Sequence, residues 1–332
     1  MKTSSYALLL VALTLLVVVA FTASLLIGPS ELGVAASLAA ILSDETTLAG
    51  MVMHEIRLPR ALLGLMIGAT LGLSGAVLQG FLRNPLAEPG ILGISSAAAL
   101  GAVLTIYTGF SAIFPLALPL AGLAGAFIAV LLIRAMAGIN GSTLTLILAG
   151  VAVSAFAGAM TTLVLNLSPN PFAAMEIVFW MLGSLTDRSM VHVWLAAPFM
   201  VFGWLVMALC ARPLDALSLG EGAAASLGID MRRTQLLAVF GTACSVGAAT
   251  AVAGAIGFIG LVVPHVLRPL VGAVPSRLLP ASALGGAAML LTADILVRLI
   301  APERDLKLGV LTALVGAPFF LWLVWRVRGK LI

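Results

Sequence analysis

The sequence predicts an all-α polytopic membrane protein with about ten transmembrane helices. Of its 332 residues, 62% are hydrophobic and only 9% are charged, whereas about 25% of a soluble domain is charged. A soluble domain has no way to hide that much apolar surface, because much of its chain must face water. Glycine is abundant, at 34 residues, as expected where helices approach one another closely in a bilayer.

The apolar stretches can be placed in order along the chain, since a crossing helix needs about 20 mostly apolar residues. The first stretch is longer than the roughly 7–15-residue core of a signal peptide, which favours an uncleaved first helix. The stretch near 258–272 is short and contains Pro264 and His265, so it is either tilted or part of a broken pair with the preceding span. The candidate spans are roughly 6–28, 58–81, 91–110, 113–136, 142–166, 190–211, 233–256, 258–272, 279–300 and 306–327.

The distribution of Lys and Arg predicts the orientation, because cytoplasmic loops carry an excess of both. With the N-terminus inside, eleven basic residues fall at cytoplasmic ends and six at outer ends. Both termini are therefore expected in the cytoplasm. The inner set is Lys2, Arg83, Arg134, Arg212, Arg232, Arg233, Arg268, Arg277, Arg326, Arg328 and Lys330, and the outer set is Arg57, Arg60, Arg188, Arg298, Arg304 and Lys307.

Three connections are longer than tight turns. Within 29–57, Ser30 is a candidate cap for a short interfacial helix that ends near Asp44. The segment 167–189 contains Trp180, a residue type suited to a membrane boundary. The segment 212–233 is the longest cytoplasmic loop.

Several activities are excluded by what the sequence lacks. It has no GxxxxGK[ST] phosphate loop and no HExxH or GxSxG arrangement, so ATP hydrolysis by that loop is excluded. Its basic residues are scattered among apolar spans, which does not indicate nucleic-acid binding. Cys210 and Cys244 are interpreted as buried small side chains. The histidines form no cluster of ligands, so we expect no metal site and no cofactor.

Several long motifs follow one another in a fixed order. Residues 57–60 read RLPR, residues 83–90 read RNPLAEPG, and residues 254–265 read GAIGFIGLVVPH. Arg268, Asp294, Arg298 and the GAPFF run at 316–320 come later. Together these motifs closely resemble the FecCD permease family, over about residues 50–327.

The resemblance implies an architecture and a set of partners. Members of this family have ten helices per subunit in two inverted five-helix halves, here roughly 1–170 and 171–332 of a single permease domain. It implies a homodimer whose transport path lies at the dimer interface, near spans five and ten. It also implies two ATP-binding subunits on the cytoplasmic side and a periplasmic substrate-binding protein on the other.

Arginines at matching positions of similar permeases receive acidic residues of the binding protein, which makes Arg57, Arg60 and Arg298 candidate docking residues. The planar guanidinium suits carboxylates, although snorkelling at helix ends is the simpler interpretation of such residues. Asp294 is the acidic residue expected well inside a span, and such a carboxylate is a functional candidate. Because Arg298 lies four residues later, a structural ion pair is an equal alternative.

Two further sets follow from the resemblance. The cytoplasmic loop 212–233 corresponds to the helix that couples the permease to its ATPase; from the residues alone it is a surface helix. Its candidate coupling residues are Leu219, Gly220, Glu221, Ala225, Leu227 and Gly228. The inner mouth of the path corresponds to Asn84, Leu86, Ser142 and Thr143, which otherwise lie in two plain interhelical turns.

The function implied is that of a non-catalytic permease subunit in a bacterial inner membrane, working by alternating access with energy from a separate ATPase. An ion-coupled secondary transporter is the alternative from a different class; it would need several polar groups at mid-membrane, which this chain does not offer. An intramembrane enzyme would need a catalytic pair inside the bilayer, and none is found. The cargo stays open among ferric siderophores, haem and cobalamin, with an iron chelate favoured because most members of the family carry one.

Overall fold

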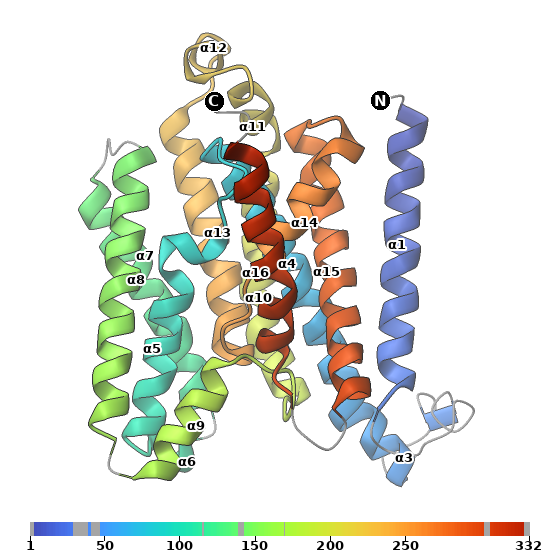
Figure 1. Ribbon diagram of the computed structural model, residues 1–332, viewed down its shortest axis with the longest axis vertical. Helices are drawn as coiled ribbons and strands as arrows, with labels where there is room; N and C mark the ends of the chain where they lie inside the picture. The colour runs from blue at the N-terminus through green and yellow to red at the C-terminus, as the bar shows by residue number, and fades with distance from the viewer. Residues whose placement is uncertain are drawn as a thin grey trace.

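The computed structural model describes residues 3–28, 39–40, 47–114, 116–138, 143–168, 170–301 and 306–328. Within these ranges every regular element is helical, and the long helices run side by side along one direction (Figure 1). The long helices are α1 (Thr3–Leu26), α4 (Leu58–Phe81), α7 (Ala117–Ala137), α8 (Thr143–Asn166), α10 (Met190–Ala208), α13 (Met231–Ala253), α15 (Pro275–Ile300) and α16 (Leu308–Arg328).

These eight long helices are each long and apolar enough to cross a membrane, which confirms eight of the expected spans. The other two expected spans are the shorter helices α5 (Ile94–Tyr107) and α14 (Ile259–Leu267). Both are short because they begin after irregular backbone inside the bundle. The segment before α5 contains the single turn η2 (Pro89–Leu92), and α14 continues into the turn η3 (Arg268–Val271).

The connections hold more structure than expected. Helix starts at Leu48, ahead of the expected span, and runs through α3 (Leu48–Met51) and the π-helical turn η1 (Val52–Arg57) into α4. The other short helices are α6 (Phe110–Ile113), α9 (Pro171–Met181), α11 (Ala211–Leu217) and α12 (Glu221–Ser226). Of the interfacial helix expected between Ser30 and Asp44, the described residues include only 39–40, which are helical.

Trp180 corrects one expectation. It does not sit at an open membrane boundary but is buried on α9 with Ile177, against Val103 and Ile106 of α5. The irregular segment after α9 folds α9 back against α5, a tertiary contact that the local sequence does not reveal.

Helices α4 and α13 form the centre of the bundle. In their most apolar stretches 83% and 78% of the residues are buried, against 22% for α1 and for α16. Helix α4 lies against α15 at van der Waals distance because both carry glycines there. A Cβ on Gly68 would overlap the carbonyl of Gly286, and one on Gly72 would overlap the carbonyl of Ser282. The small residues therefore permit backbone-to-backbone contact.

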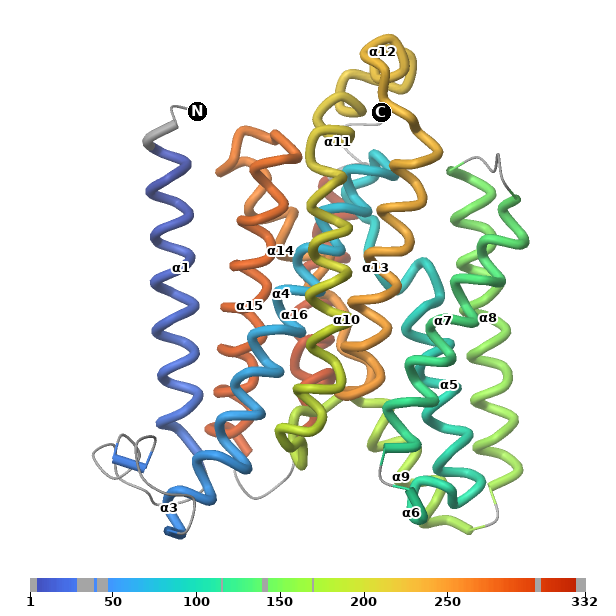
Figure 2. Tube along the Cα trace, turned by 180° about the vertical axis from the view of Figure 1, so that it is seen from behind, coloured from blue at the N-terminus to red at the C-terminus, as the bar shows by residue number. Residues whose placement is uncertain are grey.

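The two ends of the bundle differ. The start of α1, the end of α16 and the α11–α12 excursion lie at one end, which we call the α12 end; α3, α6 and α9 lie at the other, the α3 end (Figures 1 and 2). Helix α1 stands at the margin and packs mainly on α15. Both termini are thus on the same side of the bundle.

Candidate functional sites at the two ends of the bundle

An ion-pair cluster sits at the α3 end, where α4 begins and α15 finishes. The Asp294 carboxylate on α15 is 1% exposed. Arg60 of α4 donates to it from Nε, at 3.0 and 3.1 Å, and from Nη2 at 2.8 Å. Arg298, one turn further along α15, places Nη2 at 2.8 Å from Oδ2. Asp294 therefore pairs with both arginines, so the pair with Arg298 raised by the sequence exists together with a second one.

The remaining donors of Arg57 and Arg298 go largely to α1. The last carbonyls of a helix have no intrahelical partner, and a cation is favourable beside them. Nη1 of Arg57 donates to the carbonyls of Leu25 and Leu26 at 2.9 and 3.1 Å. Nη1 of Arg298 donates to the carbonyls of Ser24, at 2.9 Å, and Ile27, while its Nη2 donates to Ser24 Oγ at 2.7 Å.

Because of these bonds, the arginines are less exposed than the sequence predicted. The sequence placed Arg57, Arg60 and Arg298 at the outer surface, but Arg57 is 3% and Arg298 9% exposed. Tertiary contacts with α1 bury them, and sequence spacing gave no sign of those contacts. The structure does bring all three together, around the same end of α4.

A cavity of about 320 Å³ opens beside this cluster. Its wall also includes Glu55, Asp187 and Arg188, which no sequence motif grouped with the three candidate arginines. Arg188 donates from Nε to the carbonyl of Val252. Burial lowers the pKa of Arg188, and the charge of Asp187 partly opposes that shift. A cation-rich pocket of this kind can accept carboxylates.

The α12 end presents a small exposed helix. Helix α12 lies between Gly220 and Gly228, whose φ angles of 107° and 79° suit glycine. Leu219 and Leu227 flank it and are 69% and 63% exposed. Glu221 and Ala225 are also exposed. The candidate coupling residues thus form a short projecting helix flanked by exposed leucines, as expected for a surface helix.

The expected gate residues lie at the same end. Asn84 Oδ1 accepts a hydrogen bond from the Leu86 backbone at 2.9 Å, which closes the turn after α4. Thr143 is the first residue of α8, while Ser142 lies outside the described residues. The continuation of the Asn84 turn packs on α8, because Gly150 of α8 lies directly against Leu92.

The two interrupted segments meet inside the bundle, around a cavity of about 170 Å³. Glu88, just before η2, and Gly257, just before α14, both line it. The Glu88 carboxylate lies beside the backbone N–H of Phe258 and next to Gly257, and Phe258 precedes the first turn of α14. A carboxylate is favourable there, because the first N–H groups of a helix have no partner within the helix. Sequence analysis did not single out Glu88.

Helix α14 is held in place from α4. Gln79 Nε2 donates to the carbonyls of Gly260 and Leu261 at 3.2 and 3.3 Å, and its Oε1 accepts from Arg268 Nη2 at 2.7 Å. The ring of His265 lies against Phe319 of α16, with centroids 5.7 Å apart. Among the residues that the structure describes, no three His, Cys, Asp or Glu side chains are grouped as metal ligands would be.

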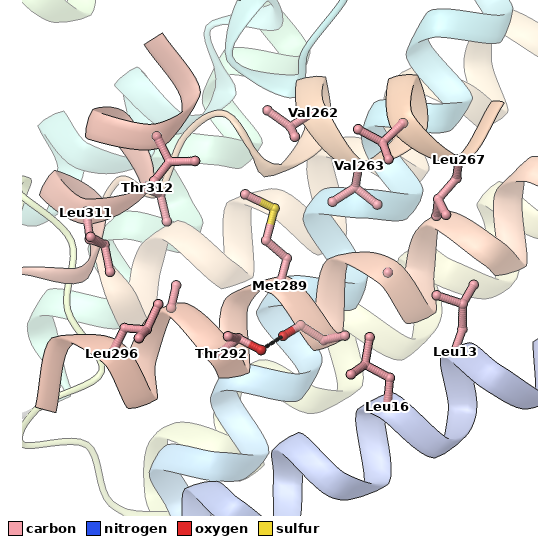
Figure 3. Close-up of a pocket in the computed structure, with 15 residues that line it drawn as sticks. Leu13, Leu16, Val262, Val263, Leu267, Met289, Thr292, Leu296, Leu311 and Thr312 are labelled. Atoms are coloured by element: carbon pink, nitrogen blue, oxygen red, sulfur yellow. Dashed lines mark hydrogen bonds between the residues drawn. The ribbon is translucent and has the colours of Figure 1, made fainter. Parts of the chain in front are cut away.

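An apolar groove of about 410 Å³ separates α1 from α14 and α16 (Figure 3). Leu13 and Leu16 of α1 face Val263 and Leu267 of α14 across it. Its Thr292 hydroxyl is bonded within its own helix, to the carbonyl of Ala288 at 2.8 Å. The groove consequently offers hydrocarbon contact and little for a polar molecule to recognise.

Known proteins resemble the chain over nearly its whole length. The model of the FecCD transport family matches residues 15–326. The cobalamin import system permease protein BtuC of Halobacterium salinarum is 44% identical over 279 residues, which cover 83% of this chain and 74% of that protein. The hemin transport system permease protein HmuU of Yersinia pestis is 41% identical over 279 residues, covering 82% and 83%.

The fold also matches a solved structure. An ABC transporter described as metal-chelate type, in an inward-facing conformation, superposes with a TM-score of 0.84 at 33% identity, and covers 96% of this chain and 98% of its own. The match agrees with the bundle of long apolar helices described above. The resemblance drawn from the motifs is confirmed, and the chain is a membrane-spanning member of the FecCD transport family.

Proposed function

We propose that this chain is the permease subunit of an ABC importer that carries a ferric siderophore, haem or cobalamin from the periplasm to the cytoplasm. The observation that carries the proposal is the family match over residues 15–326. Relatives named for cobalamin and for hemin are almost equally similar, at 44% and 41% identity. An iron chelate is our first choice among the cargoes.

The α3 end is the docking face for a periplasmic substrate-binding protein. Arg57, Arg60 and Arg298 gather there beside a cavity that Arg188 also lines. Within the described part of the cluster, Asp294 is the carboxylate that pairs with Arg60 and Arg298. The four arginines around the cavity outnumber the carboxylates of Glu55, Asp187 and Asp294 by one, and this excess supports the binding of acidic side chains from a partner.

The α12 end is the surface that binds a separate ATPase, since the chain has no phosphate loop of its own. Leu219, Gly220, Glu221, Ala225, Leu227 and Gly228 form the coupling contact. This places both termini in the cytoplasm of a bacterium whose inner membrane the chain spans.

Transport takes place by alternating access in a homodimer, with two ATPase subunits bound. Asn84, Leu86, Ser142 and Thr143 close the inner mouth of the path between the two copies. The two five-helix halves, roughly 1–170 and 171–332, each contribute one interrupted pair, which is α4 with α5 and α13 with α14. Such interrupted helices at matching places are typical of transport sites.

Reconstitution of the chain in liposomes with its ATPase and its binding protein tests the proposal. ATP hydrolysis would be compared with ferric siderophores, haemin and cobalamin as cargoes. We expect one of the three to stimulate hydrolysis and uptake together. A flat response to all three would overturn the cargo class, and uptake without the ATPase would favour an ion-coupled carrier.

A further inference from the structure

Three arginines share the docking face, but they do not share the same freedom to bind a partner. A guanidinium has five N–H donors. Arg298 makes five contacts within the subunit. Its Nε donates to the Asp294 carbonyl, its Nη1 to the carbonyls of Ser24 and Ile27 at the end of α1, and its Nη2 to Ser24 Oγ and Asp294 Oδ2. A partner carboxylate could reach Arg298 only by displacing one of them.

Arg60 is differently placed. All of its hydrogen bonds go to the Asp294 carboxylate, from Nε and Nη2. This uses one side of the planar guanidinium and leaves the end that joins Nη1 to Nη2 without a bond to the described residues. The Arg60 side chain is 14% exposed and lines the 320 Å³ cavity. The end of a guanidinium fork can take a carboxylate through two parallel hydrogen bonds.

We propose that Asp294 is a positioning residue for partner recognition: it holds Arg60 from the side, so that the free end of the fork is presented to an acidic side chain of the binding protein. Asp294 does not meet the partner, since it is 1% exposed and lies behind the arginines. Arg57 and Arg298 anchor α1 at the rim of the pocket. The inference rests on the docking role proposed above and assigns that role chiefly to Arg60.

A competing role for Asp294 is charge masking, in which it only lowers the positive charge of the site. The two roles predict opposite effects of Asp294→Asn. Loss of masking raises the net charge by one and strengthens attraction to an acidic partner. Loss of positioning frees the Arg60 side chain, so that the partner must order it again on binding.

The chain offers a matched control for this test. Asp187 lines the same cavity, and Asp187→Asn makes the same change in charge without touching Arg60. Its φ of 58° is one that asparagine tolerates well. The measurement is the dissociation constant of the complete permease–ATPase complex in lipid nanodiscs for its own substrate-binding protein, at low and moderate salt.

We expect Asp294→Asn to weaken docking about tenfold, as for one charge-assisted hydrogen bond, with a faster off-rate. Asp187→Asn removes a negative charge from the cavity wall without disturbing Arg60, so we expect it to tighten docking. Arg60→Lys keeps the charge but loses the fork, and we expect it to weaken docking as much as Asp294→Asn does. Should Asp294→Asn assemble poorly, Asp294→Glu carries the test, because it keeps the charge but shifts the carboxylate that holds Arg60. Weaker docking by Asp294→Glu supports positioning, and unchanged docking refutes it.

One outcome would refute the positioning role of Asp294, and a different outcome would refute the docking face. Docking by Asp294→Asn as tight as that by Asp187→Asn, with Arg60→Ala still defective, would refute positioning and leave the docking face in place. Unchanged docking by Arg60→Ala, by Arg60→Lys and by a variant lacking all three arginines would refute the docking face itself. A reversal of charge at Arg60 that is rescued by a basic substitution on the binding protein would identify the partner carboxylate.

Discussion

At the scale of single residues, the buried charges of the α3 end act mainly on the subunit's own backbone. Arg298 lies 274 residues from Ser24 in the chain, yet it satisfies the Ser24 carbonyl and hydroxyl. Because the end of a helix otherwise leaves its carbonyls unpaired, these bonds fix where α1 finishes. Removing one partner from a buried set of this kind is costly, since the others are left unpaired in a poor solvent for charge.

Arg298→Gln should loosen the end of α1 without unfolding the bundle. The substitution removes the cation and most of the donors that hold Ser24 and Ile27. We expect a loss of about 3–5 kcal/mol in the free energy of unfolding and faster hydrogen exchange over residues 24–28. Arg134→Gln is the control, since Arg134 donates only to an exposed carbonyl of the next turn, that of Gly138. Equal exchange in both variants would contradict the anchoring role.

At the scale of elements, the two interrupted helix pairs are joined to one another. The Glu88 carboxylate lies beside the start of α14, and Gly260 of α14 lies directly against the ring of Pro89. Phe258 has a φ of 68°, and its side chain fills the space beside Gly316 of α16. The turn that begins at Asn84 therefore contacts α14, and Phe258 links this contact to α16.

Two substitutions of Glu88 test whether its oxygen atoms or its negative charge stabilise the start of α14. Glu88→Ala removes the carboxylate that lies beside the Phe258 N–H, and we expect a loss of about 1–3 kcal/mol in the free energy of unfolding. Glu88→Gln keeps a carbonyl oxygen in the same place and should cost much less. Thermal unfolding of the purified complex measures the stability of both variants. Glu176→Ala, at an exposed position of α9, is the control. A Gln variant as unstable as the Ala variant would show that the charge itself is required.

Helix α12 should matter to energy coupling and not to folding. Its flanking residues Leu219 and Leu227 are exposed and contribute little to the bundle core. We expect the double variant Leu219→Ala, Leu227→Ala to keep its melting temperature but to lose at least tenfold in binding of the ATPase, since each buried leucine at an interface is worth about 1.5–3 kcal/mol. Leu8→Ala on the exposed face of α1 is the control. Retention of full transport by the double variant would contradict the coupling role.

At the scale of the whole molecule, the subunit is a bundle with a tight centre and an apolar perimeter. Helices α4 and α13 are largely buried, while α1 and α16 are mostly open. Leu314, Leu321 and Trp325 on α16 are 69%, 70% and 74% exposed. In a membrane such a perimeter meets either lipid or another helix, and lipid alone gives little drive for association.

Native mass spectrometry of the complex released from lipid measures the proposed assembly. We expect two copies of this chain with two ATPase subunits, because a closed two-fold arrangement is the commonest way for identical subunits to enclose a path. Cross-links between cysteines introduced on α8 of one copy and on α16 of its partner should form in membranes. A complex with one copy of each subunit would contradict the homodimer.

The order and number of helices were accessible from the sequence because apolar length is a local property. The features that could not be predicted depend on contacts between residues far apart in the sequence. No local pattern places Arg298 beside Ser24, turns Trp180 inward against α5, or brings Glu88 to Phe258. The motif around Asn84 and that around Pro264 both marked the interrupted segments, but only the folded chain shows that these segments touch.

The bonds from Arg57 and Arg298 to the end of α1 also have a consequence for the order in which the chain folds during synthesis. Synthesis delivers α1 to the membrane long before α15 exists, so the carbonyls of Leu25 and Leu26 receive Arg57 early, whereas those of Ser24 and Ile27 must wait for Arg298. Helix α1 therefore enters the bilayer well before the residue that completes the bonding of its end. In the interval, Arg57 is the arginine among the described residues that can bind the last carbonyls of α1.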